Sequence, residues 1–245
     1  MKALRPALPL LLGLVLWQGA VWLWQVPSFI LPGPVRVAAA LVDNAGLIAG
    51  HAAVTGLEVA LGLGLGAVLG WLSAVALALS PAARGAIGPI LVFTQAVPVF
   101  ALAPILTLWF GYGLGSKVAM ALLIIYFPVT SSFLDALLQT PAPWLAQARV
   151  MGGGGWRQMW YLRIPAALPG FLSGLKLAAV YAPIGAVIGE WVGASRGLGY
   201  LMLLANGRAK TDLMFAALVV LAVLAIALHR AVDHLAAAAL RRRFG

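Results

Sequence analysis

The side chains able to perform acid–base or metal chemistry are few and scattered along this 245-residue chain. It has no cysteine, three histidines and six acidic residues, which are Asp43, Glu58, Asp135, Glu190, Asp212 and Asp233. A metal-dependent membrane transferase needs carboxylates gathered in one place, and these are spread over the whole chain. His229 and His234 are five residues apart, so they lie on different sides of a helix, and Arg230 would oppose a cation. We therefore predict no catalytic residue, no metal site and no enzyme.

One polar segment lies between two very apolar blocks and is well placed to contact a partner. It reads Ala146-Gln-Ala-Arg-Val-Met-Gly152 and, after nine further residues, Leu162-Arg-Ile-Pro165. Gly152 allows a turn with positive φ, and Pro165 suits the start of a following helix. The glycines that end at Gly155 are not followed by Gly-Lys-Ser/Thr, so they form no phosphate-binding loop. From these residues alone, an ordinary polar loop with a glycine-rich turn remains the alternative.

Hydropathy predicts the elements that hold this segment. The chain is 63% hydrophobic and 9% charged, and its mean hydropathy is +1.03. Apolar runs of about 20 residues recur, and each is long enough to cross a bilayer as a helix. The predicted fold class is therefore an all-α membrane protein with about six transmembrane helices. We place these spans at about residues 8–26, 54–79, 87–110, 118–138, 166–190 and 213–232.

The basic residues indicate an orientation for these spans. With both termini cytoplasmic, ten basic residues lie inside and five outside, in agreement with the positive-inside rule. The inside group is Lys2, Arg5, Arg84, Arg149, Arg157, Arg163, Arg230, Arg241, Arg242 and Arg243. The outside group is Arg36, Lys117, Arg196, Arg208 and Lys210. The formal net charge of +10 thus follows from topology, and we predict contact with membrane lipid and none with nucleic acid.

The predicted spans contain regularly spaced glycines and several prolines. Glycines recur every four residues on three helix faces, at Gly62, Gly66 and Gly70, at Gly170 and Gly174, and at Gly185, Gly189 and Gly193. Such faces let helices approach closely in lipid, and we favour packing within the chain over a dimer seam. Pro98 and Pro104 in the third span, and Pro183 in the fifth, predict broken helices that line a cavity or pack within protein. Glu190 ends the fifth span, where it faces a cavity, anchors a gate or meets water.

Three segments resemble one family of membrane proteins. The segment from Ala146 to Pro165 resembles the E-A-A-x3-G-x9-I-x-L-P loop of inner-membrane permease subunits of bacterial ABC importers, with Ala146 in place of the glutamate. The run from Gln95 to Gly113 resembles Q-x-x-P…A-P…W-F-G-x-G of the nitrate, sulfonate and pyrimidine branch. Residues 182–215 look most like permeases for thiamine pyrimidine precursors.

The resemblance implies a type I ABC importer permease fold in the bacterial inner membrane. It implies a first transmembrane helix and external elbow in residues 1–50, a permease core in residues 51–234 and a basic cytoplasmic tail in residues 235–245. The expected partners are a second copy of the chain, two ABC ATPase subunits and a periplasmic or lipid-anchored substrate-binding protein. ATP and Mg²⁺ would bind the ATPase, so no cofactor is expected in this chain.

The resemblance also assigns candidate site residues. The ATPase-coupling loop would include Ala148, Arg149, Gly152, Trp156 and Pro165. The translocation pathway would include Gln95, Pro98, Phe100, Tyr181 and Glu190.

The expected solute is a thiamine pyrimidine precursor. Permeases for riboflavin, alkanesulfonate or taurine, and nitrate share parts of the same pattern and remain alternatives. A secondary transporter or channel is a more distant one, since it would need charged residues inside the spans, where this chain has almost none.

Overall fold

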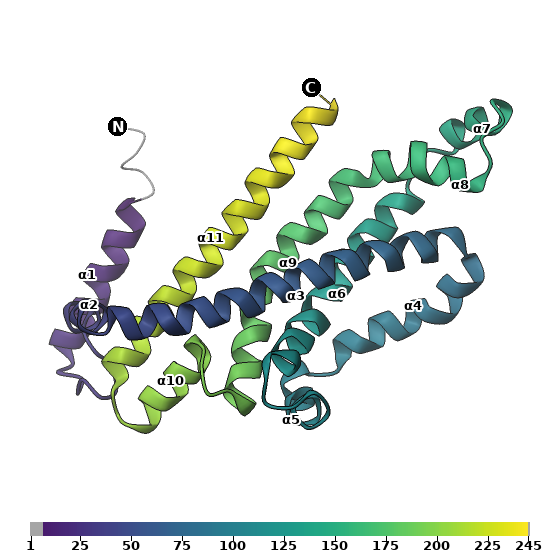
Figure 1. The fold of residues 1–245 in the computed structure, drawn as a ribbon. Helices are drawn as coiled ribbons and strands as arrows, with labels where there is room; N and C mark the ends of the chain where they lie inside the picture. The colour runs from purple at the N-terminus through teal and green to yellow at the C-terminus, as the bar shows by residue number, and fades with distance from the viewer. Residues whose placement is uncertain (1–6, 245) are drawn as a thin grey trace.

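The computed structural model describes residues 7–244, which are helical with no strand (Figure 1). The elements are α1 (Ala7–Leu23), α2 (Pro34–Asp43), α3 (Ala45–Leu79), α4 (Pro81–Ala96), α5 (Val99–Phe110), α6 (Leu114–Leu138), α7 (Ala142–Val150), α8 (Gly155–Gln158), the π-helix η1 (Met159–Arg163), α9 (Ile164–Gly193), α10 (Leu198–Gly207) and α11 (Thr211–Phe244).

Helix α6 lies between α3 and α9, and this trio forms the centre of the protein. Val59, Ile125 and Ala182, one from each helix, are almost completely buried in one apolar cluster. In lipid, close packing of this kind is a main source of association between helices.

The glycine faces bring these three helices together. A Cβ added at Gly62, Gly66 or Gly70 of α3 would lie 2.6–2.7 Å from side chains of α6, namely Ala121, Ile125 and Val129. On α9, Gly174 and Gly185 pack against the backbone of α6 in the same way. The predicted packing within the chain is therefore confirmed for these glycines.

Within the described residues, four stretches are long and apolar enough to cross a membrane. They are α3 with 35 residues, α6 with 25, the continuous stretch Gly155–Gly193 with 39, and Thr211–Arg243 with 33. The pair α4 and α5 gives a fifth, bent span, and the 17-residue α1 is a shorter apolar helix. Helix α3 begins at Ala45, earlier than the predicted start at residue 54, so the predicted domain division at residue 50 falls inside it.

The predicted third span is broken at only one of its prolines. Helix α4 ends at Ala96, Pro98 starts the next helix, and α5 turns away from α4 by 101°. Pro104 lies inside α5, and Pro183 lies inside α9, without interrupting either helix. The predicted breaks at these two positions are wrong, because a proline can be tolerated where surrounding helices compensate for the lost hydrogen bond.

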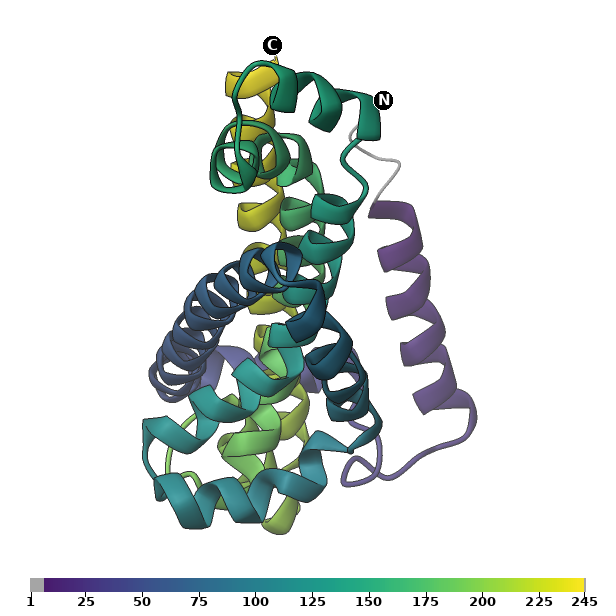
Figure 2. The same ribbon diagram turned by 90° about the vertical axis from the view of Figure 1, so that its right-hand side faces the viewer.

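The two ends of the molecule carry different elements. The start of α1, the end of α11 and the segment from α7 to η1 lie toward one end, which we call the loop end (Figures 1 and 2). Helices α5 and α10 lie toward the opposite end, called the far end (Figure 2). The cytoplasmic placement of the loop end stays a prediction, and Lys2 and Arg5 lie outside the described residues.

Candidate functional site

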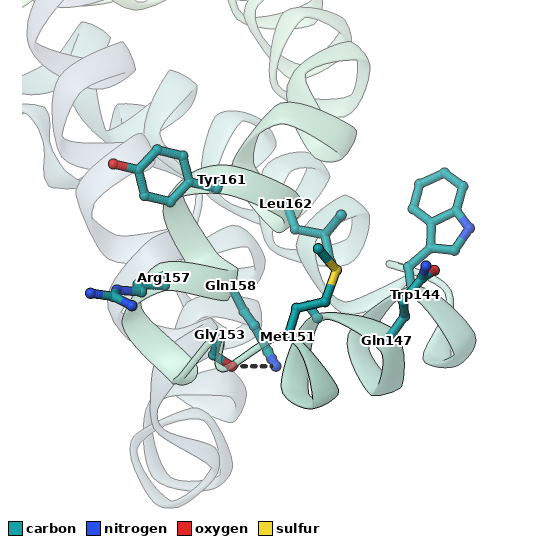
Figure 3. A pocket seen from close by; sticks show the side chains of 9 residues that line it. Trp144, Gln147, Met151, Gly153, Arg157, Gln158, Tyr161 and Leu162 are labelled. Atoms are coloured by element: carbon teal, nitrogen blue, oxygen red, sulfur yellow. Dashed lines mark hydrogen bonds between the residues drawn. The ribbon is translucent and has the colours of Figure 1, made fainter.

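A sharp turn at the loop end separates α7 from α8. Gly152 adopts φ +77°, which confirms the predicted positive φ. The N–H of Gly153 donates to the carbonyl of Ala148 at 2.8 Å and closes the end of α7. The buried Gln158 amide then donates to the carbonyls of Gly153 at 3.0 Å and Leu145 at 3.2 Å (Figure 3). Gln158 was not predicted, and it fixes the shape of the turn.

A pocket of about 580 Å³ opens between α7 and the helix that follows the turn (Figure 3). Its lining includes Trp144, Gln147, Met151, Arg157, Gln158 and Tyr161. No residue of α7 is buried, and Met151 and Tyr161 are 80% and 83% exposed. Three arginines and no acidic residue occur between residues 139 and 175. Exposed apolar surface beside unbalanced positive charge is suited to a partner with apolar and acidic groups.

The predicted coupling residues surround this pocket and turn. Ala148 lines the pocket, and Arg149 is exposed on α7. Trp156 is exposed and packs edge to face on Trp160, with ring centroids 5.8 Å apart. Pro165 lies in the first turn of α9 as predicted. However, α8, η1 and α9 run on as one helical stretch, which joins the turn to α9 without a break.

The predicted pathway residues fall into two groups. Gln95, Pro98 and Phe100 lie at the bend between α4 and α5, and all three are exposed. Tyr181 is exposed on α9, where Leu177, Val180, Tyr181 and Ile184 form an apolar face between 41% and 50% exposed. Their spacing places them on one side of the helix. These residues are therefore free to face a pathway or a second subunit.

Glu190 differs from the other predicted pathway residues because it is buried. Its Oε1 accepts a hydrogen bond from the Thr55 hydroxyl at 2.6 Å, and its Oε2 accepts one from the N–H of Gly199 at 2.5 Å. The Thr55 hydroxyl in turn accepts from the N–H of Leu198 at 2.8 Å. Glu190 and Thr55 together cap the start of α10, where free N–H groups favour a negative charge. Glu190 does not meet water, and it joins α3, α9 and α10.

Lys117, which the charge count assigned to the outer side, is buried near this carboxylate at the far end. Its Nζ donates to the carbonyls of Tyr112 and Gly193, each at 2.5 Å, and so caps the end of α9. The nearby Glu58 is 3% exposed, and its Oε2 has no protein partner. We call Thr55, Glu58, Lys117 and Glu190 the far-end cluster. Glu58 and Glu190, which lie within predicted spans, were the sequence signal for it, but their partners were not predictable.

Comparison with known proteins finds a matching family model and similar permeases. Residues 66–241 match the family model described as binding-protein-dependent transport system inner membrane component. The chain is 47% identical over 234 residues to a probable ABC transporter permease protein of Haemophilus influenzae, covering 96% of each chain.

Two further relatives have named solutes. The chain is 38% identical over 201 residues to the formylaminopyrimidine transport permease protein ThiX of Halalkalibacterium halodurans, covering 81% of this chain and 80% of that one. It is 36% identical over 241 residues to the riboflavin transport system permease protein RibX of Chloroflexus aurantiacus, covering 93% and 85%.

A solved structure shares the fold. The chain matches an inward-facing structure of the MetNI methionine ABC transporter with a TM-score of 0.63 and 19% identity, covering 82% of this chain and 96% of that one.

Proposed function

The chain belongs to the binding-protein-dependent transport system inner membrane component family, and we propose that the solute it carries is a pyrimidine precursor of thiamine. It is an ABC transporter permease, a multi-pass subunit of the bacterial inner membrane, and the ATPase is a separate subunit. Family membership replaces the secondary-transporter and channel alternatives.

The proposed solute rests on the 38% identity to a formylaminopyrimidine permease. The 36% identity to a riboflavin permease over more of the chain makes riboflavin the second candidate. Sulfonate and taurine permeases are less similar, at 30% and 29% identity. Both leading candidates are planar heterocycles, which can stack on aromatic rings and hydrogen-bond at their edges.

The proposed pathway lies between two copies of the chain. The exposed face of α9, with Tyr181 at its middle, would line it together with the bend that carries Gln95, Pro98 and Phe100. A heterocycle could then stack on Phe100 or Tyr181 and bond to the Gln95 amide. A mostly apolar site with few polar groups is typical of small-molecule binding.

Coupling to ATP would pass through the loop-end pocket. The ATPase would bind the exposed α7 and the pocket beside Arg157, with Mg²⁺ and ATP held on the ATPase itself. Because the stretch Gly155–Gly193 is continuous, closure of two ATPase subunits would tilt α9 and move Tyr181. The free energy for this change comes from the difference in ATPase affinity between the two permease states.

The proposal is tested by uptake into vesicles that contain the complete transporter. Labelled formylaminopyrimidine should be taken up, and unlabelled riboflavin or taurine in excess should not compete. Gln95→Ala and Tyr181→Ala should each lower pyrimidine uptake at limiting solute, whereas Trp22→Ala on the peripheral α1 should not. If riboflavin competes fully, or if both pathway variants match the wild type, the assigned solute or site is wrong.

A further inference from the structure

A second pocket opens at the far end, beside the far-end cluster. It has a volume of about 440 Å³, and its lining includes Gly46, Gly50, His51, Ser195, Arg196 and Tyr200. These residues come from the start of α3, from the connection between α9 and α10, and from α10 itself. Gly46, Gly50, Ser195 and Arg196 are exposed, so the pocket is open to a large partner.

Hydrogen bonding fixes the histidine of this far-end pocket. The Nδ1 atom of His51 accepts a hydrogen bond from the N–H of Gly197 at 3.0 Å. An accepting Nδ1 carries no proton, so the ring is neutral and its proton is on Nε2. The ring also stacks on Tyr200, with centroids 5.9 Å apart and planes inclined by 26°. His51 therefore presents a hydrogen-bond donor on its free edge.

The far-end cluster holds Arg196 in place from both sides. In the chain before Arg196, the carbonyl of Gly193 accepts a hydrogen bond from Lys117. In the chain after Arg196, the N–H of Leu198 donates to Thr55 and the N–H of Gly199 donates to Glu190. Gly197 has φ +113°, and a Cβ there would collide with the Glu190 carboxylate. The connection that carries Arg196 is thus tied down at each end, which lowers the entropy cost of binding.

The pocket is positive and rich in donors. Arg196, His51, Ser195 and Tyr200 all offer N–H or O–H groups, and no carboxylate is part of the lining. The one ion pair within residues 7–244 joins Lys176 to Asp233, so the Arg196 guanidinium has no carboxylate partner of its own. A guanidinium in this setting is suited to a carboxylate.

We propose that this pocket receives an acidic side chain of the substrate-binding protein when that protein docks. The inference rests on the proposed function, since it assumes an importer supplied by a binding protein. An open pocket at the end opposite the coupling loop is accessible to a docked protein. A solute in transit would instead meet the α9 face that carries Tyr181.

The test measures ATP hydrolysis by the complete transporter in lipid nanodiscs as the concentration of binding protein is varied. The probe is the binding protein that supports uptake through the wild-type complex. Arg196→Glu should raise the concentration for half-maximal stimulation by at least about tenfold, because like charges then face each other. Arg208→Glu, at another exposed far-end arginine outside the pocket, should change it by less than about twofold.

Two substitutions of His51 test the roles of the two ring nitrogens separately. In His51→Asn the side-chain oxygen can still accept from Gly197, but the outer donor is lost. In His51→Gln the outer donor is kept, but the acceptor is lost. Loss of docking affinity in the first variant and a lower Tm in the second would support separate roles for the two edges. The opposite pattern would contradict the assigned ring orientation.

Charge reversal identifies the partner. A Glu→Lys or Asp→Lys substitution on the binding protein should restore the affinity of the Arg196→Glu transporter, and salt should weaken wild-type docking. Arg196→Gln gives the same test if the reversed charge prevents assembly. Half-maximal stimulation within about twofold of the wild type in either variant would overturn the proposal. So would an unchanged binding-protein response combined with a higher solute requirement, which would indicate contact with the solute. If no binding protein stimulates the wild type, the proposed function itself fails.

Discussion

The two ends of this permease treat polar groups in opposite ways. At the far end, Thr55, Lys117 and Glu190 are buried. Their hydrogen bonds of 2.5–2.8 Å link α3, α6, α9 and α10. At the loop end, Met151 and Tyr161 are exposed beside arginines that have no acidic neighbour in the sequence. Buried polar groups must be satisfied within the chain, whereas exposed apolar groups are suited to a partner. The far-end cluster therefore stabilises the subunit, whereas the exposed apolar surface of the loop end is suited to assembly.

The comparison implies that damage at the two ends has different consequences. Loss of a far-end group should destabilise the subunit, because a remaining buried charge or N–H is left without a partner. Loss at the loop end should change coupling while the fold is retained. Each prediction below tests this division, starting with the largest expected loss of stability.

The largest effect is expected for Lys117→Met. This change removes the donor to the carbonyls of Tyr112 and Gly193 and leaves two buried carboxyl groups without a cation. Each buried carbonyl left without a donor costs about 1–3 kcal/mol, so the loss of both should exceed the effect of losing a single buried hydrogen bond. Thermal unfolding of the purified subunit, followed by tryptophan fluorescence, should show a much lower Tm. Lys176→Met, which removes a partly exposed lysine, is the control and should have little effect. Equal Tm values for the two variants would contradict the predicted difference between the buried and the partly exposed lysine.

A smaller loss is expected for Thr55→Val. The shape is retained, but Glu190 loses one donor and the N–H of Leu198 loses its acceptor. An unsatisfied buried group costs about 1–3 kcal/mol. The matched control is Thr130→Val, since Thr130 is equally buried but bonds only to Tyr126 in its own helix. The same thermal unfolding assay should rank Thr55→Val clearly below Thr130→Val, and the reverse order would show that Glu190 does not depend on Thr55.

At the loop end, Gly152→Val should affect coupling more than stability. A β-branched residue at φ +77° is strained by about 1–2 kcal/mol, and the exposed turn can relax locally. Vesicles that contain the transporter should hydrolyse ATP without the matching uptake of solute. Gly154→Val is the control, because Gly154 has φ −71° and open space around it. Unchanged coupling in Gly152→Val would remove the assignment of this turn to the ATPase.

Single cysteines should report which end faces the cytoplasm without altering stability. The chain has no native thiol, and added side chains meet no atoms within 4 Å at Gly113, Gly154 and Gly207. An impermeant thiol reagent applied from outside should label Gly113→Cys and Gly207→Cys. Gly154→Cys and Arg242→Cys should be labelled only after the membrane is opened. Labelling of Gly154→Cys from outside would reverse the two ends and contradict the positive-inside assignment.

The sequence was enough to predict features that depend on neighbouring residues. Apolar runs identified the membrane spans, because a bilayer selects helices by length and hydropathy. The positive φ at Gly152 and the break at Pro98 each follow from the backbone limits of one residue. The glycine faces predicted close helix packing for the same local reason.

Only the tertiary structure decided which distant groups meet. Lys117 was predicted only to lie on the outer side, and its burial follows from acceptors that the end of α9 supplies. Thr55 and Glu190 are 135 residues apart, and no periodicity within either helix identifies that pair. Pro183 leaves α9 continuous, because the packing of neighbouring helices determines whether a proline interrupts a helix in lipid. Hydropathy is a property of each segment, but a buried hydrogen bond depends on two segments meeting in space.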